Sequence, residues 1–314
     1  MTAPTTTPLA SIWRPGRPVD LHSTLGPLRR GAGDPALRLG HDEAWRVSTT
    51  PAGPATLHLR VRGGSTDAAE VQATAWGPGA GWFLDQVPEL LGEGDDWSEL
   101  DVSSHLLLTR TRHRLPGLRI PRTGLVWESL APAILEQKVL GVDAWLSYRQ
   151  LIRRFGAIPP GPAPDGMRLF PTPAHWRGVP SWEFHRAGVD PKRAATAMRA
   201  ARVADALERT LTRGRGGPEV AAVLTAVPGI GPWTAAEVMQ KAHGDPDTVS
   251  VGDYHLAHFV GSALIGRRVD DDGMLELLEP WRGHRHRVVR LIECSGATNP
   301  RFGPRMARID YRGI

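Results

Sequence analysis

Cysteine is nearly absent from this chain of 314 residues, which contains only Cys294. A single cysteine excludes an intrachain disulfide, a cysteine-type zinc site and a four-cysteine iron–sulfur cluster. Apolar runs of about 18 residues, the length that crosses a bilayer, are absent too. The first residues, MTAPTTTPLASIWRPG, lack the charged and apolar regions of a signal peptide. We therefore expect a cytoplasmic protein with no membrane partner.

Lysine is also scarce, because Lys138, Lys192 and Lys241 are the only lysines among 38 basic side chains. The others are arginine, and the net charge is +5. Guanidinium groups bind phosphate bidentately and stack on bases, which favours a nucleic-acid partner. A GC-rich genome also enriches arginine together with alanine, glycine and proline, so composition leaves both explanations open.

The hydrophobic pattern divides the chain into a mixed part and a helical part. ATLHLRVRG (55–63) alternates as a half-buried strand does, and residues 67–92 predict a helix interrupted at a Gly/Pro cluster. After the proline-containing connection at 115–124, helical spacing takes over, with helices predicted over 125–156 and 190–211. We predict an α+β fold: a mixed lobe over 1–112, a helical lobe over 113–246 and a second helical lobe over 247–314, with the active site in the cleft between the helical lobes.

A glycine-rich turn joins two predicted helices at residues 219–242. PGIG ends the first helix, since proline blocks the backbone pattern and glycine adopts positive φ without steric cost. Pro232 suits the first position of the next helix, and Ile230 is expected to fill the gap between the two. Such a helix–hairpin–helix leaves N–H groups at the positive end of a dipole, a favourable place for a phosphate. An ordinary glycine-rich turn is the alternative.

A carboxylate follows the hairpin at the start of the next predicted helix. In DTVSVGDYHLAHFVGSALIG (247–266), Gly252 and Asp253 precede the helical run. Aspartate is a favoured N-cap, so Asp253 by itself indicates capping as readily as catalysis.

The hairpin VPGIGPWTA (227–235) followed by Asp253 resembles the helix–hairpin–helix (HhH-GPD) DNA glycosylases, and more narrowly the DNA-3-methyladenine glycosylase II family. Stretches at 115–139, 169–176, 187–201 and 279–289 fit in the same order, so the resemblance covers roughly residues 15–295. It implies base excision repair, in which a damaged base is flipped from duplex DNA and its N-glycosidic bond is hydrolysed to leave an abasic site.

The resemblance also implies roles for single residues. Asp253 matches the essential aspartate, which stabilises the oxocarbenium-like sugar and activates water. Trp233 stands where bifunctional relatives carry a lysine nucleophile, which implies a monofunctional enzyme without lyase activity. Trp233, Tyr254 and Trp281 match pocket aromatics, which would hold a cationic alkylated purine by about 0.5–2 kcal/mol each. Core packing is the alternative for any one tryptophan.

Three positions depart from the family. Glu237 replaces a pocket aromatic, and either pairs with Lys241 at i, i+4 or hydrogen-bonds the base and changes the substrate. Lys138 stands where the family inserts an apolar wedge, and Gln137 beside it is expected on the minor-groove side. Pro27 lies near another pocket aromatic, so one wall would be thinner.

The remaining predictions concern partners and ions. The partner is double-stranded DNA with a damaged base, bound by a monomer through Gly229, Ile230, Gly231, Thr234, Gln137 and Lys138. The segment 281–314 carries eight arginines against Glu293 and Asp310, and is either a solvated face or a phosphate-binding one. No cofactor is required. The carbonyls of Thr225 and Val227 match a site at which family members bind a sodium or potassium ion.

These observations predict a monofunctional DNA glycosylase that removes alkylated purines. Two alternatives stay open: the same chemistry on a different modified base, with Glu237 reading it, and a non-catalytic DNA-binding or lesion-sensing protein. Asp253 argues against the second, because binding alone does not require a carboxylate facing the strand.

Overall fold

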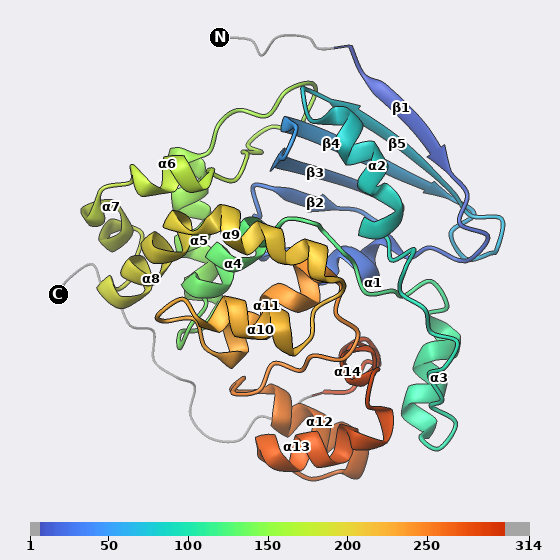
Figure 1. The fold of residues 1–314 in the computed structure, drawn as a ribbon. Coiled ribbons are helices and arrows are strands. Elements are labelled where there is room, and N and C mark those ends of the chain that lie inside the picture. The colour runs from blue at the N-terminus through green and yellow to red at the C-terminus, as the bar shows by residue number, and fades with distance from the viewer. Residues whose placement is uncertain (1–6, 299–314) are drawn as a thin grey trace.

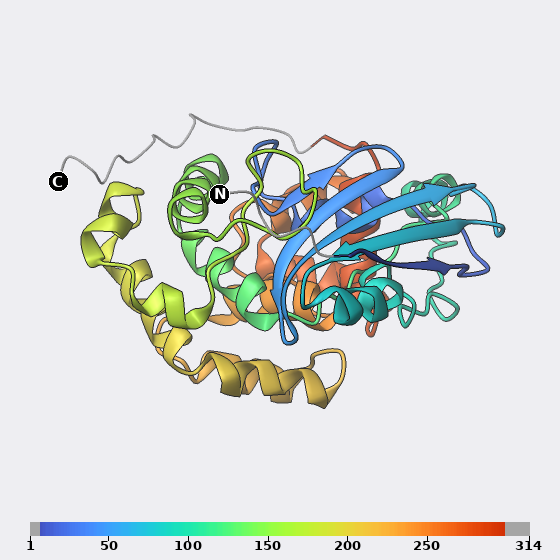
Figure 2. The same cartoon turned by 90° about the horizontal axis from the view of Figure 1, so that it is seen from above.

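The computed structural model describes residues 7–298 and shows an antiparallel sheet beside a larger group of helices (Figure 1). The sheet has the strand order β1-β5-β4-β3-β2. Its strands are β1 Leu9–Trp13, β2 Leu37–Leu39, β3 Glu43–Thr50, β4 Gly53–Arg62 and β5 Glu70–Trp76. The predicted alternation in β4 buries Leu57, Leu59 and Val61, which pack with α1 (Leu21–Leu25) and α2 (Ala80–Leu90). Figure 2 shows α2 lying along the sheet.

Residues 67–92 differ from the predicted interrupted helix. Glu70–Trp76 form β5, which pairs with β1 on one side and β4 on the other, and only Ala80–Leu90 is helical. Within β5 every second residue, Val71, Ala73 and Ala75, is buried. This period of two belongs to a strand with one buried face, and the prediction missed it because two of the three buried side chains are small.

The rest of the described chain is helical, which confirms the predicted α+β class. Its helices are α3 Leu106–Arg114, α4 Val126–Leu135, α5 Gly141–Phe155, α6 Pro173–Arg177, α7 Ser181–Arg186, α8 Pro191–Arg202, α9 Ala204–Glu208, α10 Pro218–Thr225, α11 Pro232–Val238, α12 Leu256–Ile265, α13 Asp271–Leu278 and α14 Arg285–Cys294. A π turn, Met239–His243, extends α11. Within residues 7–298, no helix has the length and apolar character that spanning a membrane requires.

The helix predicted over 125–156 is two helices. α4 ends at Leu135 and α5 begins at Gly141. Between them Lys138 has φ 53°, and it is the one non-glycine residue among 7–298 with a positive φ. A left-handed residue interrupts a right-handed helix, so the apolar spacing is helical on each side of Lys138 but not across it.

Three hydrophobic cores hold the elements together. The first lies between the sheet, α1 and α2. The second joins α4 to α11 around stacked and edge-to-face rings of Trp127, Phe170, Trp176 and Phe184, whose neighbouring centroids are 5.5 to 6.1 Å apart. The third joins α12, α13 and α14 to residues between Trp97 and Leu118. α11 contributes to the second core, and the candidate site forms between α11, α12 and α14.

Buried ion pairs fix these parts against one another. Asp95 and Arg287 of α14 are 2.6 Å apart, with 0% and 6% of their side chains exposed. Glu128 of α4 pairs with Arg46 of β3 at 3.5 Å and also accepts hydrogen bonds from the Ser48 hydroxyl and the Thr49 amide. Breaking one partner of a buried pair costs about 3–5 kcal/mol, so these contacts fix α14 and the sheet relative to their neighbours.

Candidate active site

The hairpin between α10 and α11 brings the chain unusually close to α8. Gly229 has φ 97°, and a Cβ at this position would lie 2.3 Å from Thr196 Oγ1, so only glycine fits. Ile230 is 5% exposed and packs in the second core, which confirms that it fills the gap between the helices. The amides of Gly229 and Gly231 have no acceptor within residues 7–298, so both could bind an anion.

Three of the predicted DNA contacts are engaged within the hairpin itself. The Ile230 amide donates to the Val227 carbonyl at 3.0 Å. Gln137 Nε2 donates to the Gly229 carbonyl at 2.9 Å and to Thr234 Oγ1 at 2.8 Å. Because Thr234 is 2% exposed and both amide hydrogens of Gln137 are used, these side chains brace the turn, and their contacts with DNA stay predictions. Lys138, next to Gln137, is exposed.

Residues 7–298 contain no group of three or more His, Cys, Asp or Glu side chains placed to hold a metal ion. The predicted monovalent ion would use backbone carbonyls instead. One of these, Val227 O, already accepts the Ile230 amide, though a carbonyl oxygen has a second lone pair. The ion at Thr225 and Val227 therefore stays a prediction.

Asp253 stands before α12 and accepts three hydrogen bonds. Its Oδ1 accepts the amides of His255 and Leu256 at 2.8 and 3.0 Å, as a capping aspartate does. Its Oδ2 accepts the indole N–H of Trp233, across from α11, at 3.2 Å. One oxygen thus caps the helix, and the other is held in a fixed position toward the neighbouring helix. The catalytic role of Asp253 stays a prediction.

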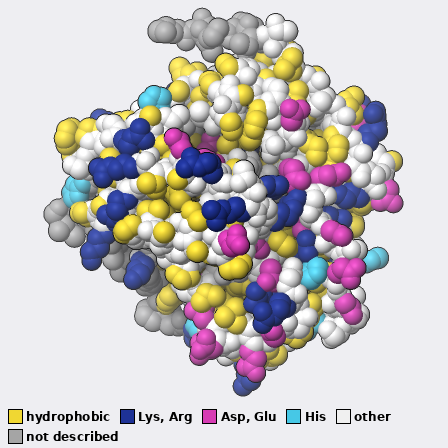
Figure 3. Space-filling view, in the orientation of Figure 1, with side chains coloured by type: hydrophobic (Ala, Val, Ile, Leu, Met, Phe, Trp, Pro, Cys, Tyr) yellow, Lys and Arg dark blue, Asp and Glu magenta, His cyan; other side chains and the backbone are white. Residues whose placement is uncertain are grey.

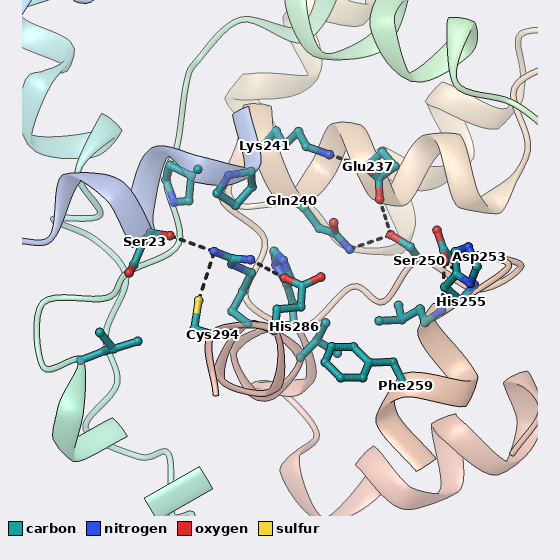
Figure 4. Close-up of a pocket in the computed structure, with 18 of the residues that line it drawn as sticks. Ser23, Glu237, Gln240, Lys241, Ser250, Asp253, His255, Phe259, His286 and Cys294 are labelled. Atoms are coloured by element: carbon teal, nitrogen blue, oxygen red, sulfur yellow. Dashed lines mark hydrogen bonds and ion pairs between the residues drawn. The ribbon is translucent and has the colours of Figure 1, made fainter. Parts of the chain in front are cut away.

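A cavity of about 810 Å³ opens beside Asp253, between α11, α12, α14 and α1; we call it the Asp253 cavity. Figure 4 shows Glu237, Ser250 and Asp253 at one end, with Ser23 and Cys294 toward the other. The six charged side chains that line it balance in sign: Arg114, Lys241, Arg290, Glu237, Asp253 and Glu293. Pro27 also lines it, at the wall where the sequence predicts a missing aromatic.

Glu237 pairs with Lys241, as the first of its two explanations predicts, and its reading of a base stays a prediction. Its carboxylate forms an ion pair with Lys241, and its Oε1 accepts the Ser250 hydroxyl at 2.6 Å, yet both charged residues line the cavity. Their side chains are 15% and 12% exposed. Burial alone would raise the pKa of the Glu237 carboxyl, but Lys241, Ser250 and His286 outweigh it, so this pKa is lowered and the group stays ionised at neutral pH.

The predicted pocket aromatics do not form the cavity lining. Trp233 contacts the site as the donor to Asp253. Trp281 belongs to the third core, where its indole N–H donates to the Asp101 carbonyl at 2.7 Å. Tyr254 is 78% exposed and lies against His255. Among the described residues, Phe259 is the one Phe, Tyr or Trp in the lining.

The sequence did not predict several lining residues. Gln240 belongs to the same face as Glu237, three positions on, and helical spacing could have found it. Ser250 precedes Asp253 by three residues within a loop, where no periodic pattern exists. His22 of α1 and His286 of α14 come from distant parts of the chain, so only the tertiary fold brings them here.

The described arginines of the basic C-terminal segment form ion pairs within the protein. All four arginines of residues 281–298 are paired within the protein: Arg282 with Glu279, Arg285 with Asp247, Arg287 with Asp95 and Arg290 with Glu293. The other four, together with Asp310, lie outside the described residues.

No protein-family model and no curated protein matches the sequence. Solved structures do match its fold. The 3-methyladenine DNA glycosylase from Archaeoglobus fulgidus aligns with a TM-score of 0.70 and 16% identity, over 91% of this chain and 98% of that one. The 8-oxoguanine glycosylase/lyase of Clostridium acetobutylicum aligns in its apo form with a TM-score of 0.69 and 14% identity, over 94% and 100%. Its complex with double-stranded DNA containing cytosine opposite 8-oxoguanine gives a TM-score of 0.68 at 14% identity, over 94% and 98%.

These alignments extend over the mixed lobe, the hairpin and the helices after it, since they cover more than nine-tenths of the chain. They confirm at the level of the fold the resemblance that the hairpin and Asp253 carry in the sequence. The chain has the fold of the helix–hairpin–helix DNA glycosylases.

Proposed function

We propose that the protein is a monofunctional DNA glycosylase, which hydrolyses the N-glycosidic bond of a damaged base flipped out of duplex DNA. One observation carries the proposal: the Asp253 carboxylate is held by three donors in the wall of a cavity that could receive a base. Capping alone would need only the two backbone donors of α12. The fold shared with structures of DNA glycosylases supports the same chemistry.

Asp253 would act on the sugar. As the bond from C1′ to the base nitrogen breaks, its electron pair leaves with the base and positive charge develops on the sugar ring, which a fixed carboxylate stabilises. A water then adds its hydroxyl to C1′ and gives up a proton, which Asp253 is placed to accept. A cationic alkylated purine leaves as a neutral base, the proton passes from Asp253 to solvent, and an abasic site remains. The Trp233 donor keeps the carboxylate from rotating during these steps.

The lack of lyase activity rests on the amines near the site. Cleavage of the strand by a Schiff base needs a free amine that can reach C1′. The hairpin helix presents Trp233 next to Asp253, and Lys241 in the cavity is paired with Glu237. We therefore expect hydrolysis alone.

DNA would be held from the hairpin side. The unpaired amides of Gly229 and Gly231 suit one phosphate. Lys and Arg side chains gather over α5 to α8, at the left of Figure 3, and exposed ones on α5 and α8 include Arg153, Lys192 and Arg202. Extruding a base costs a few kcal/mol and least for a weakly paired one, so a weakly paired lesion is favoured.

Alkylated purines remain the first substrates to try, because alkylation weakens the glycosidic bond and a modest site then suffices. The test is release of N3-methyladenine and N7-methylguanine from methylated duplex DNA by wild type and Asp253→Asn. Asparagine can still accept the amides of His255 and Leu256, so the cap is kept while the charge is removed. We expect the variant to lose turnover by about 100-fold or more.

Strand breaks that appear only after alkali would support the monofunctional assignment, whereas breaks without alkali would contradict it. A purely binding protein would release no base, and its affinity for DNA would rise when the Asp253 charge is removed. That outcome, rather than a loss of turnover, would overturn the proposal.

A further inference from the structure

Four polar side chains form a connected wall in the Asp253 cavity: Glu237 of α11, Gln240 and Lys241 of the π turn, and Ser250 of the loop before Asp253. Glu237 lies one helical turn beyond Trp233. Glu237 binds Lys241 and Ser250, and the Ser250 hydroxyl accepts Gln240 Nε2 at 3.1 Å. The Gln240 amide nitrogen also donates to the Thr248 carbonyl at 2.9 Å. Figure 4 shows these groups facing the same space as Asp253. Since one helical turn rises about 5.4 Å, a base attached to a sugar at Asp253 would point its far edge at this wall.

The wall offers donors and acceptors that the protein leaves free. Lys241 Nζ has three hydrogens and donates one to Glu237, and the buried Glu136 carboxyl interacts with it electrostatically. Gln240 Oε1 has no partner among the described residues. His286 is 6% exposed, and its Nδ1 bonds the Asp245 carbonyl at 2.8 Å, which leaves Nε2 as an acceptor. Burial lowers the pKa of His286, so this ring is neutral at pH 7.

An ion pair of this kind matches one type of base edge. A lactam edge has a ring N–H beside a carbonyl: the carbonyl accepts from an ammonium, and the N–H donates to a carboxylate. Lys241 and Glu237 stand side by side, so the pair fits a lactam edge whose carbonyl faces Lys241. An amidine edge, with an acceptor nitrogen beside an amino group, fits the same pair only with the base turned the other way. An edge with no N–H adds no donor to Glu237, which then keeps Lys241 and Ser250 as its partners.

We propose that Glu237 and Lys241 select bases with a lactam edge, such as N7-methylguanine or hypoxanthine, over bases without one, such as N3-methyladenine or 1,N6-ethenoadenine. This selectivity rests on the proposed glycosylase function and names its substrate class. The near absence of large aromatic rings from the lining agrees with it, because stacking on a cationic ring is not what this cavity provides. Undamaged guanine has the same edge, but it is held by its pairing with cytosine and by a stronger glycosidic bond.

The four bases named above separate the effect of the base edge on the release rate from the effect of the base charge. N7-methylguanine and N3-methyladenine are both cationic, hypoxanthine and 1,N6-ethenoadenine are both neutral, and one member of each pair has the lactam edge. The measurement is the single-turnover rate of release from duplexes carrying each base, divided by its rate without enzyme. We expect wild type to favour the lactam base in both pairs by about 10-fold or more, because a site built to bond an N–H rejects an analogue without it.

Each single variant, Glu237→Gln or Lys241→Met, should lower the rate enhancement over the reaction without enzyme. We expect a loss of about 10- to 100-fold for the two lactam bases and of less than about 3-fold for the other two bases. The double variant Glu237→Gln/Lys241→Met removes both charges of the pair. It is measured in place of a single variant that folds poorly. Arg62→Met, which removes an exposed cation on β4 that does not line the cavity, is the control. Affinity for a duplex with a tetrahydrofuran abasic analogue should not change, since that site has no base edge.

Equal enhancement for all four bases, or an equal loss for all four in the variants while abasic binding is kept, would overturn the edge selectivity and leave the glycosylase intact. A preference for the two cationic bases over the two neutral ones would also overturn the edge selectivity. It would support a glycosylase that selects alkylated purines by their charge. Release of no base by wild type would overturn both proposals together.

Discussion

The helix α11 with its π turn has two faces that the fold uses differently. One face is buried in the second core by residues Ala235, Val238, Met239 and Ala242. The opposite face meets Asp253 or lines its cavity, through Trp233, Glu237, Gln240 and Lys241. Helical periodicity alone separates the two sets.

The difference shows how one short helix both packs into the core and provides side chains to the site. Ala235 and Ala242 are small, which allows α4 to pack closely on the buried face. The polar face keeps its side chains in place by bonds among themselves and with Ser250 and Asp253. Changes on the packed side should therefore alter the free energy of unfolding, while changes on the cavity side should alter rate or selectivity.

The largest effect on the packed side is expected at the turn that leads into α11. Gly229→Ala should lower the free energy of unfolding by about 2–4 kcal/mol, because it adds a positive-φ penalty to a contact of 2.3 Å with Thr196 Oγ1. Urea unfolding followed by circular dichroism measures the change.

The double variant Gly229→Ala/Thr196→Ala separates the two causes. Removing the Thr196 hydroxyl and methyl relieves the nearest contacts, so the second substitution should recover part of the loss and leave the cost of φ 97°. Thr196→Ala alone is the control. A cost below about 0.5 kcal/mol for Gly229→Ala would contradict the close approach of the hairpin to α8.

On the cavity side, Trp233→Phe should reduce the excision rate by about 10-fold, since a hydrogen bond to a charged group contributes about 1.5–3 kcal/mol when fully formed. Because the Trp233 Nε1 to Asp253 Oδ2 distance is 3.2 Å, a long hydrogen bond, we expect an effect at the lower end of that energy range. Single-turnover excision at saturating enzyme measures it, with DNA affinity unchanged.

Trp281→Phe is the matched control, because it also removes one indole N–H, here from a bond to the Asp101 carbonyl. It should leave the excision rate unchanged and lower stability by about 1 kcal/mol. An equal loss of rate in both variants would mean that Trp281 has a part in the site that its position in the third core does not indicate.

The sequence predicts the elements that are locally encoded. The PGIG turn, Pro232 at the helix start and the periodicity around Ile230 give the hairpin, and the aspartate before a helical run gives Asp253. The missed break at Lys138 has a physical reason: a single left-handed residue leaves the apolar pattern on both sides unchanged. Alternation in β5 was hidden because alanines at two buried positions carry little hydrophobic signal.

The cavity lining is harder to predict because it is assembled from separate regions. Residues near positions 22, 237, 250 and 286 meet only through packing of the three cores. Aromatic residues illustrate the same point: Trp127 and Trp176 are in the second core, and Trp281 is in the third. Eleven tryptophans in the sequence gave many candidates for a base pocket, and none of them, all within residues 7–298, lines the Asp253 cavity.

The smallest predicted effect concerns pH and the packed side of the π turn. His243 is fully buried, and burial, together with Arg122, lowers its pKa from 6.5 to about 4. Between these values the unfolded chain binds a proton that the folded one does not, so stability is full above pH 6.5 and is lost as the pH falls toward 4. From pH 7.5 to 5.5 the free energy of unfolding should fall by about 1 kcal/mol on this account.

His243→Gln tests the assignment, because glutamine can keep a hydrogen bond to the Thr210 hydroxyl but does not titrate. Urea midpoints at pH 7.5, 6.5 and 5.5 should converge between wild type and variant as the pH falls. His286, whose pKa burial also lowers, adds a loss in the same direction and is present in both proteins, so it cancels in the difference. A difference that stays constant across this range would show that His243 is protonated alike in the folded and unfolded chain, and hence that the π turn opens to solvent on the side that packs against Thr210.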